Sequence, residues 1–253
     1  IVSDQRYYAF NLLEELDIPG EWYIDRTTHM LYYYPQYDLD KTDMIISQIR
    51  DSIINVDNCA NITFKGLTVE CSINNNISIG TKAENIVING CIVRNSGNTA
   101  VDIGGKNCGI KNSDVYDAGN NCIRVYGGVC DNTTYDLANN YVINCDVHDS
   151  GKKISTSICV RDEANGSIVE HNRLYNSPAA AINGGGFEKK WRYNEIFDCV
   201  KESSDAGAIY LGRNSKDRGT EISYNYIHDI YGEYGLDYAF FCGVYLDDFE
   251  AGI

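Results

Sequence analysis

The sequence has few prolines, no long hydrophobic run and a shortage of positive charge. Only 3 of its 253 residues are Pro, and no apolar stretch reaches the roughly 18 residues that a membrane span needs, so we expect no membrane partner. Asp and Glu number 36 against 21 Lys and Arg, which gives a net charge of -15. Because such a surface repels phosphates, we expect no nucleic acid partner, and a neutral ligand or one held locally by Arg is favoured.

Signatures of metal and disulfide chemistry are also missing. None of the ten Cys forms a CxxC pair or a zinc-type Cys/His cluster, so we predict no transition-metal site. We interpret most of them as small buried hydrophobes from a reduced or anaerobic source, not as a disulfide framework. No signal peptide is visible, and the chain opens at Ile1 without Met. We expect a piece of a longer chain with further coils or domains, whose parent is secreted or displayed at the cell surface.

Residues 1–48 differ in pattern from the rest of the chain. The apolar positions within 7–16 fit a short helix, which Pro19 and Gly20 end. Residues 21–25 and 30–35 then fit the two strands of a hairpin. We predict that this segment is a small cap or lead-in to a second domain, 49–253, because a solenoid needs its end covered.

A repeat of 22 to 24 residues begins near residue 52 and grows only by insertion. Two apolar columns lie five residues apart, and each recurs seven times. The first column is Phe64, Ile88, Ile110, Val142, Val169, Trp191 and Ile222, and the second is Val69, Val93, Val115, Val147, Leu174, Ile196 and Ile227. Such a unit indicates a solenoid, and the Leu framework of a leucine-rich repeat is absent.

The repeat predicts an all-β fold, a right-handed parallel β-helix. Each unit holds two short strands of alternating polarity, such as 86–88 and 100–103, and coils stacked in register would form parallel sheets. Asn172, Asn194 and Asn225 recur at one bend. We expect their side-chain amides to bond from coil to coil, which is a structural role and not a catalytic one.

Chemistry is expected on the outward face of the second strand of each unit. The alignment places five apolar residues inward and in register, namely Ile103, Val125, Val160, Leu211 and Leu246. One side of the last four coils then gathers six charged residues: Arg161, Asp162, Glu163, Arg213, Asp247 and Asp248. Insertions lengthen mostly these coils, and long loops over a regular scaffold commonly build the walls of a binding groove.

Several stretches resemble a family of bacterial carbohydrate-active proteins that share a right-handed β-helix. They are NLLEELDIPGEWYID (11–25), DAGAIY (205–210), Arg218-Gly219, YNYIHD (224–229) and GVYLDD (243–248). The known activities of that family are glycoside hydrolases, including α-L-fucosidase and xylanase types. By this resemblance, which spans most of the chain, the catalytic carboxylates are Asp205 and either Asp247 or Asp248.

The working hypothesis is hydrolysis of a glycosidic bond in a plant or microbial polysaccharide or oligosaccharide. One of the three Asp would be the general acid and another the nucleophile or base. The residues expected to bind the sugar are Arg161, Tyr210, Arg213, Arg218, His228 and Tyr245. A flat strand would separate Asp205 from Asp247 by about 20 Å at 3.3 Å per residue. Their pairing therefore requires the turn at Asp205 to fold back over the groove, or a different partner.

Two other functions stay open. A polysaccharide lyase or epimerase would need Ca²⁺ or a neutralising Arg or Lys, and the oxygen ligands for Ca²⁺ could come from Asp162, Glu163, Asp247 and Asp248. A hydrolase would need no cofactor. A β-helix without catalytic activity would only bind carbohydrate, and the three Asp would then be turn residues.

Overall fold

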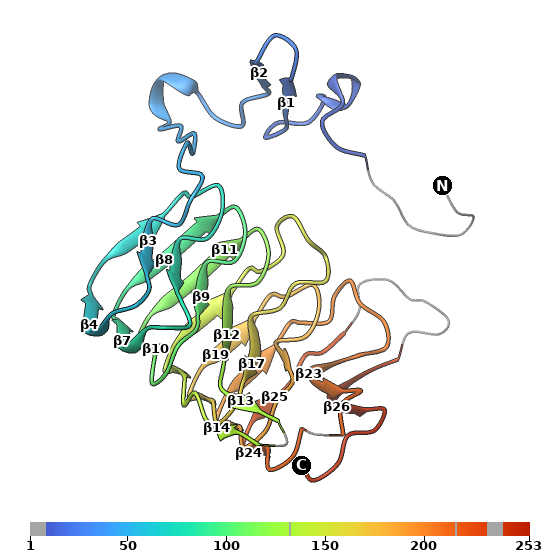
Figure 1. The fold of residues 1–253 in the computed structure, drawn as a ribbon. Coiled ribbons are helices and arrows are strands. Elements are labelled where there is room, and N and C mark those ends of the chain that lie inside the picture. Colours follow the sequence, from blue (N-terminus) through green and yellow to red (C-terminus); the bar gives the residue numbers. More distant parts are fainter. Residues whose placement is uncertain (1–8, 132, 216, 232–239) are drawn as a thin grey trace. The chain divides into compact units, whose positions relative to one another are not determined.

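The computed structural model describes residues 9–131, 133–215, 217–231 and 240–253 (Figure 1). The chain divides into two compact units, residues 1–46 and residues 47–253. Among the described residues, no helix is long and apolar enough to cross a membrane.

The first unit contains a β-hairpin. β1 (Trp22–Asp25) pairs antiparallel with β2 (Met30–Tyr33), which confirms the predicted hairpin. The carboxylate of Asp25 accepts hydrogen bonds from the backbone N–H groups of Thr27 and Thr28 and so closes the turn. A single 3-10 turn, η2 (Leu39–Lys41), follows. The role of this unit as a cap stays a prediction.

The helix predicted over 7–16 is wrong for the residues that the structure describes. Only the 3-10 turn η1 (Leu13–Glu15) forms there, and residues 7 and 8 lie outside the described part. Asn11 has a left-handed backbone with φ 57°, and its side chain binds both the N–H and the C=O of Ile24. These two bonds hold Asn11 beside β1 and out of a helical conformation.

The second unit is a parallel β-helix whose coils contribute strands to three sheets (Figure 1). The β4 sheet consists of β4 (Ala60–Lys65), β7 (Glu84–Asn89), β10 (Gly109–Lys111), β15 (Tyr141–Ile143), β18 (Ile168–Glu170), β21 (Lys190–Arg192) and β24 (Glu221–Ser223). The β5 sheet consists of β5 (Thr68–Glu70), β8 (Ile92–Ser96), β11 (Asp114–Ala118), β16 (Asp146–His148), β19 (Arg173–Tyr175), β22 (Glu195–Phe197) and β25 (Tyr226–Ile227).

The third sheet is the eight-stranded sheet, and it positions the candidate site. It consists of β3 (Ile54–Val56), β6 (Ile77–Ile79), β9 (Val101–Ile103), β12 (Ile123–Gly127), β17 (Val160–Ala164), β20 (Ile182–Gly184), β23 (Ala206–Gly212) and β26 (Phe241–Asp247). A small antiparallel pair, β13 (Val129–Cys130) with β14 (Tyr135–Asp136), lies within the insertion that follows β12.

Both apolar columns predicted from the repeat are confirmed. Phe64 pairs with Ile88, and the same column continues through every coil to Ile222. The second column runs likewise from Val69 to Ile227. The side chains of these columns form much of the buried core, since stacking the coils is what covers their apolar faces.

Each coil carries three strands where two were predicted. The β4-sheet and β5-sheet strands are joined by a very short bend, and only two residues separate β18 from β19. One of these two, His171, turns the chain with a left-handed φ of 58°. The apolar spacing continues across so short a bend, so the sequence pattern alone does not separate the two strands.

The predicted asparagine ladder is confirmed at this bend. The Asn172 side-chain amide donates to Oδ1 of Asn194, and the amide of Asn194 donates to Oδ1 of Asn225, both at 3.0 Å. Asn172 and Asn194 are buried, so the ladder satisfies polar groups that water does not reach. All ten cysteines are free, and six of them are buried, as expected for small hydrophobes.

The predicted register of the eight-stranded sheet is wrong at one coil. Val125 pairs with Asp162 and not with Val160, so a carboxylate occupies the inward position of this column. Asp162 pairs in turn with Gly184, where a Cβ would collide with the carbonyl oxygen of Asp162. The alignment chose Val160 because an apolar pattern does not anticipate a charged residue in the core.

Asp162 is therefore not part of any outward site. Asp162 and Lys189 are both fully buried, with Nζ of Lys189 3.1 Å from Oδ1 of Asp162. Trp191 Nε1 and Ser167 Oγ donate to the other carboxylate oxygen at 2.7 and 2.6 Å. Burial lowers the pKa of Lys189, and the adjacent carboxylate opposes that shift. This ion pair belongs to the core of the solenoid.

Candidate functional site

The outward face of the eight-stranded sheet carries a column of polar and aromatic side chains, one from each coil. In order along the solenoid the outward column is Asn55, Ser78, Asp102, Arg124, Arg161, Asn183, Tyr210 and Tyr245. Two positions further along the strands, Glu163 pairs with Tyr126 and Asp247 pairs with Gly212. Arg161 thus belongs to the same column as Tyr210, two positions earlier than the sequence alignment placed it.

At the β23–β26 end of this face, two carboxylates meet two tyrosines. The hydroxyl of Tyr210 donates to Oδ2 of Asp247 at 2.6 Å, and the hydroxyl of Tyr245 donates to Oδ1 of Asp205 at 3.0 Å. Arg213 Nε lies 3.6 Å from Oδ2 of Asp247, and the charge of Asp247 also acts on the Tyr245 hydroxyl. We call these five residues the carboxylate–tyrosine cluster.

The turn before β23 brings Asp205 into the cluster. Asp205 has a left-handed backbone with φ 56°, so the chain bends where it enters the strand. Gly207 follows closely, and a Cβ there would lie 2.8 Å from Cβ of Tyr245. The absence of a side chain at this position lets Tyr245 lie against β23 with its hydroxyl at Asp205. Tyr245 thus links β26 to Asp205 at the entrance of β23, while Tyr210 links β23 to Asp247.

The hydrogen bonds of the cluster fix the protonation of Asp247, Tyr210 and Tyr245 near neutral pH. The hydrogen bond from Tyr210, assisted by the backbone N–H of Asp248, lowers the pKa of Asp247. Burial and the bond to Asp247 raise the pKa of Tyr210 to about 12. The bond to Asp205, followed by burial, raises the pKa of Tyr245. Asp247 is therefore an ionised acceptor, while both tyrosines keep their protons and act as donors.

The other predicted residues of this region lie around the cluster or away from it. Asp248 is exposed and supports the cluster through its backbone, since its N–H donates to Oδ1 of Asp247 at 2.8 Å. Arg213 is 69% exposed beside Asp247. Arg218 donates to the carbonyl of Ser215 and, within the described residues, has no interaction with the cluster.

His228 lies on a different sheet. It follows β25 of the β5 sheet, where its ring stacks on Phe197 with centroids 5.1 Å apart. Its Nδ1 lies 2.8 Å from Oδ2 of Asp229. The expectation that His228 lines the same face as Tyr210 is therefore not met, because alternation along one strand does not reveal which of three sheets the strand joins.

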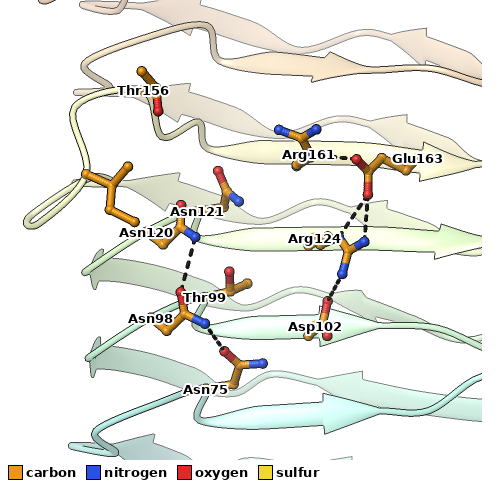
Figure 2. Close-up of a pocket in the computed structure, with 11 residues that line it drawn as sticks. Asn75, Asn98, Thr99, Asp102, Asn120, Asn121, Arg124, Thr156, Arg161 and Glu163 are labelled. Atoms are coloured by element: carbon orange, nitrogen blue, oxygen red, sulfur yellow. Dashed lines mark hydrogen bonds and ion pairs between the residues drawn. The ribbon is translucent and has the colours of Figure 1, made fainter.

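A second polar site lies several coils earlier on the same face. It is an open hollow of about 490 Å³, which we call the central pocket (Figure 2). The residues that line it are Asn75, Asn98, Thr99, Asp102, Asn120, Asn121, Arg124, Ile154, Thr156, Arg161 and Glu163. Figure 2 shows Asp102, Arg124 and Arg161 on successive strands, with the asparagines along the opposite side.

The charged side chains of the central pocket form one connected network of ion pairs. Arg124 holds Oε2 of Glu163 with Nε and Nη2, at 2.9 and 2.8 Å. Its Nη1 is 3.7 Å from Oδ1 of Asp102, and Arg161 Nε binds the second oxygen of Glu163 at 2.7 Å. Burial raises the pKa of Asp102. Burial alone would raise the pKa of Glu163 too, but the bonds from Arg161 and Arg124 outweigh it and lower that pKa.

Side-chain amides form the other wall of the pocket. Asn120 Nδ2 donates to Oδ1 of Asn98 at 3.1 Å, and Asn98 Nδ2 donates to Oδ1 of Asn75 at 3.1 Å. Ser157 at the end of the 149–157 insertion donates to Asn120 at 3.0 Å, so the loop is tied to this wall. Sequence reasoning missed Asp102 and Arg124 as site residues, because the error at Val160 moved Arg161 out of their column.

The Ca²⁺ set considered from the sequence is not assembled. Asp162 is in the core with Lys189, Glu163 is bound by two arginines, and Asp247 lies on β26. Across the described ranges, no three His, Cys, Asp or Glu side chains come together as metal ligands.

Comparisons with known proteins bear on the fold. No protein-family model matches the sequence, and no curated protein matches it. A solved structure titled "Glycoside hydrolase" is similar over 96% of this chain and 56% of its own, with a TM-score of 0.77 and 16% identity. The A-module of the mannuronan C-5 epimerase AlgE4 from Azotobacter vinelandii is similar over 81% of this chain and 54% of its own, with a TM-score of 0.55 and 12% identity.

These likenesses establish the fold as a parallel β-helix, in agreement with the sheet topology. The chain spans little more than half the length of either structure. Both titles name enzymes that act on carbohydrates, and at this level of identity the activity of the present chain is a separate question.

Proposed function

We propose that the chain is part of a glycoside hydrolase whose catalytic carboxylates are Asp205 and Asp247. The observation that carries the proposal is the exchange of bonds between two adjacent coils, in which Tyr245 donates to Asp205 and Tyr210 donates to Asp247. Hydrolysis of a glycosidic bond commonly requires two carboxyl groups on either side of one sugar linkage. The resemblance of the DAGAIY and GVYLDD stretches to α-L-fucosidase and xylanase types supports the same pair.

The cluster suits different roles for the two acids. Asp247 is 8% exposed and accepts the bond from Tyr210, which keeps it ionised, so it acts as nucleophile or base. Asp205 is exposed at the entrance of β23, where a bound sugar would cover it. In this proposal Asp205 is the general acid and gives a proton to the oxygen of the leaving sugar.

The reaction breaks the bond between the anomeric carbon and the bridging oxygen. That oxygen takes the proton of Asp205, and the anomeric carbon receives a hydroxyl from water, either directly with Asp247 as base or after a covalent bond to Asp247. Tyr210 donates the hydrogen bond that positions Asp247 and Tyr245 the one that positions Asp205, and their rings meet edge to face with centroids 5.4 Å apart. Arg213, at the exposed edge of the cluster, is placed to bind substrate hydroxyls or a uronate.

The outward column indicates an extended substrate. Polar and aromatic side chains continue from Tyr245 back to Asp102 across six coils, which suits a polysaccharide or oligosaccharide that lies along the solenoid. The net charge of -15 disfavours nucleic acid as the polymer. A polysaccharide substrate would place the parent protein outside the cell, either secreted or at the cell surface.

The test is a survey of plant and microbial polysaccharides with measurement of new reducing ends and of ultraviolet absorbance. We expect reducing ends without an unsaturated product, and activity that persists in EDTA. D205N and D247N should each lose about a hundredfold or more. D229N is the matched control, because Asp229 is a left-handed turn acid after β25 on the β5 sheet.

Two results would replace the proposal. Unsaturated products or loss of activity in EDTA would favour a lyase or epimerase that needs Ca²⁺. Binding of an oligosaccharide without turnover across the whole survey would indicate a carbohydrate-binding β-helix.

A further inference from the structure

The central pocket is separate from the carboxylate–tyrosine cluster but shares its sheet face. Asp102, Arg124 and Arg161 come from β9, β12 and β17, and Tyr210 and Tyr245 come from β23 and β26. One strand, β20, lies between the two groups. At about 4.8 Å per coil, Arg161 is roughly 10 Å from the Tyr210 coil along the solenoid. A glycan that lies along the outward column therefore passes the pocket.

Arg161 has hydrogen-bonding capacity to spare in this pocket. Its Nε binds Glu163 at 2.7 Å, and within the described residues no other acidic side chain pairs with its guanidinium. The side chain is 44% exposed, and Figure 2 shows its guanidinium at the side of the hollow away from Asp102. The edge formed by the two terminal nitrogens of a guanidinium is well matched to a carboxylate.

The carboxylates of the pocket do not neutralise Arg161. Glu163 shares its charge between two guanidinium groups, since Arg124 binds one of its oxygens and Arg161 the other. Asp102 pairs with Arg124, 3.7 Å from its Nη1, and makes no ion pair with Arg161. Arg161 thus shares its one carboxylate partner with a second guanidinium, inside a protein whose net charge is -15.

The rest of the lining suits the hydroxyl groups of a sugar. Oδ1 of Asp102 is buried and accepts no hydrogen bond. Asn75, Asn98 and Asn120 present amides along the opposite wall. A row of amides next to a guanidinium gives a carbohydrate several directional partners.

We propose that the central pocket is a glycan subsite for a uronic acid residue, whose carboxylate is received by the terminal nitrogens of Arg161. This inference rests on the proposed function, in that it takes the outward column as the path of a glycan. It narrows the substrate class to polysaccharides or oligosaccharides that carry uronic acid several residues away from the cleaved linkage.

The experiment is calorimetric titration of the D205N/D247N variant, which should bind ligands without consuming them. The probes are trimers of galacturonate, glucuronate and mannuronate, each paired with its methyl ester. Sugar, linkage and length are the same within a pair, and only the charge differs. We expect at least one acid to bind about tenfold or more tightly than its ester, and the difference to shrink as salt is added.

Variants of two arginines assign that preference to the pocket. R161Q in the same background should remove it, whereas R161K should keep part of it, because an ammonium preserves the charge but not the paired donors. R173Q is the matched control, since Arg173 is likewise a half-exposed Arg paired with acidic side chains, Asp146 and Glu195, but on β19 of the β5 sheet. Circular dichroism would show that each variant is folded.

Equal affinity for acid and ester in all three pairs, or a preference that survives R161Q, would overturn the subsite. Failure of the proposed function looks different. If no polysaccharide is hydrolysed but Arg161-dependent binding of a uronate is found, the subsite stands without the catalysis. If hydrolysis is found without any preference for charge, the catalytic proposal stands without the subsite.

Discussion

The hydroxyl of Tyr245 lies 3.0 Å from Oδ1 of Asp205, although the two residues are 40 positions apart in the chain. The contact exists because β26 stacks directly on β23, and because the turn at Asp205 and the missing side chain at Gly207 leave room for the ring. Asp247, on the same strand as Tyr245, is held by Tyr210 from the neighbouring coil. Two adjacent coils thus exchange tyrosine–aspartate bonds in opposite directions.

Removal of the Tyr245 hydroxyl should damage catalysis more than folding. In Y245F we expect kcat/KM to fall about tenfold or more, because Asp205 loses the donor that positions it. The thermal unfolding midpoint should change little, since the ring is retained. Y226F is the control, because Tyr226 is a 64% exposed tyrosine on β25. Equal activity in Y245F and wild type would contradict the role given to this bond.

Loss of the Tyr210 hydroxyl should move the acid limb of the activity profile. The bond from Tyr210 is the main cause that lowers the pKa of Asp247, so in Y210F that pKa should rise. Asp247 must be ionised to act as base or nucleophile, and activity in Y210F should therefore disappear at a higher pH than in wild type. The measurement is kcat/KM against pH for both proteins, and an acid limb that stays in place would exclude Asp247 from that role.

The buried pair of Asp162 and Lys189 should behave as one unit in stability. K189M would leave the Asp162 carboxylate in the core without a positive charge, with only Trp191, Ser167 and the backbone N–H of Ala164 as donors, which we expect to reduce the free energy of unfolding by about 3–5 kcal/mol. The double variant D162N/K189M should lose less than the sum of the two single changes. Urea unfolding measures both, and K190M on the neighbouring exposed Lys should stay within about 0.5 kcal/mol of wild type.

Glu250 should make the protein more stable at mildly acidic pH. Both oxygens of its carboxylate are buried without a hydrogen-bond partner, and burial together with nearby Asp217 raises the pKa of Glu250 to about 7. The folded state then binds more protons than the unfolded state between the ordinary value of 4.5 and about 7. Stability from this residue is thus fully present below that range and is lost as the pH rises through it.

The E250Q variant tests that linkage. Its free energy of unfolding should depend less on pH between 4.5 and 7 than that of wild type, and it should exceed wild type at the upper end of the range. Urea unfolding at a series of pH values provides the comparison. Identical slopes in the two proteins would show that Glu250 does not titrate with folding.

Much of the fold could be predicted from the sequence, because stacking imposes a repeated spacing. The two columns that begin at Phe64 and Val69 were predicted through all seven coils, and so was the ladder from Asn172 to Asn225. Each column consists of residues that serve one purpose, apolar packing or amide bonding. Equivalent positions in successive coils therefore carry the same type of residue, and the sequence shows this as a repeat.

The eight-stranded sheet was harder to predict, because one of its inward positions is charged. Asp162 is inside only because Lys189 and Trp191, from the following coil, lie beside it. A spacing rule that seeks an apolar residue selects Val160 instead, and the two-residue error displaced Arg161 from the column of Arg124. For the same reason the central pocket was not anticipated.

The candidate acids could be named from sequence, but their geometry could not. A strand of constant rise keeps Asp205 and Asp247 far apart, and that rule takes no account of a bend at a left-handed residue or of the reach of a tyrosine ring. His228 shows a second limit of sequence reasoning, which is that it does not identify the sheet to which a residue belongs. Its outward alternation was real, but it belongs to the β5 sheet, where it stacks on Phe197.

The double-mutant cycle of Asp205 and Asp247 tests the central claim most directly. It requires kcat/KM of wild type, D205N, D247N and the double variant on the most active oligosaccharide. If the two carboxylates act on one linkage, each single change should remove most of the activity, and the double variant should be about as inactive as the worse single variant. Near wild-type activity in either single variant, or losses that simply multiply in the double variant, would contradict the account.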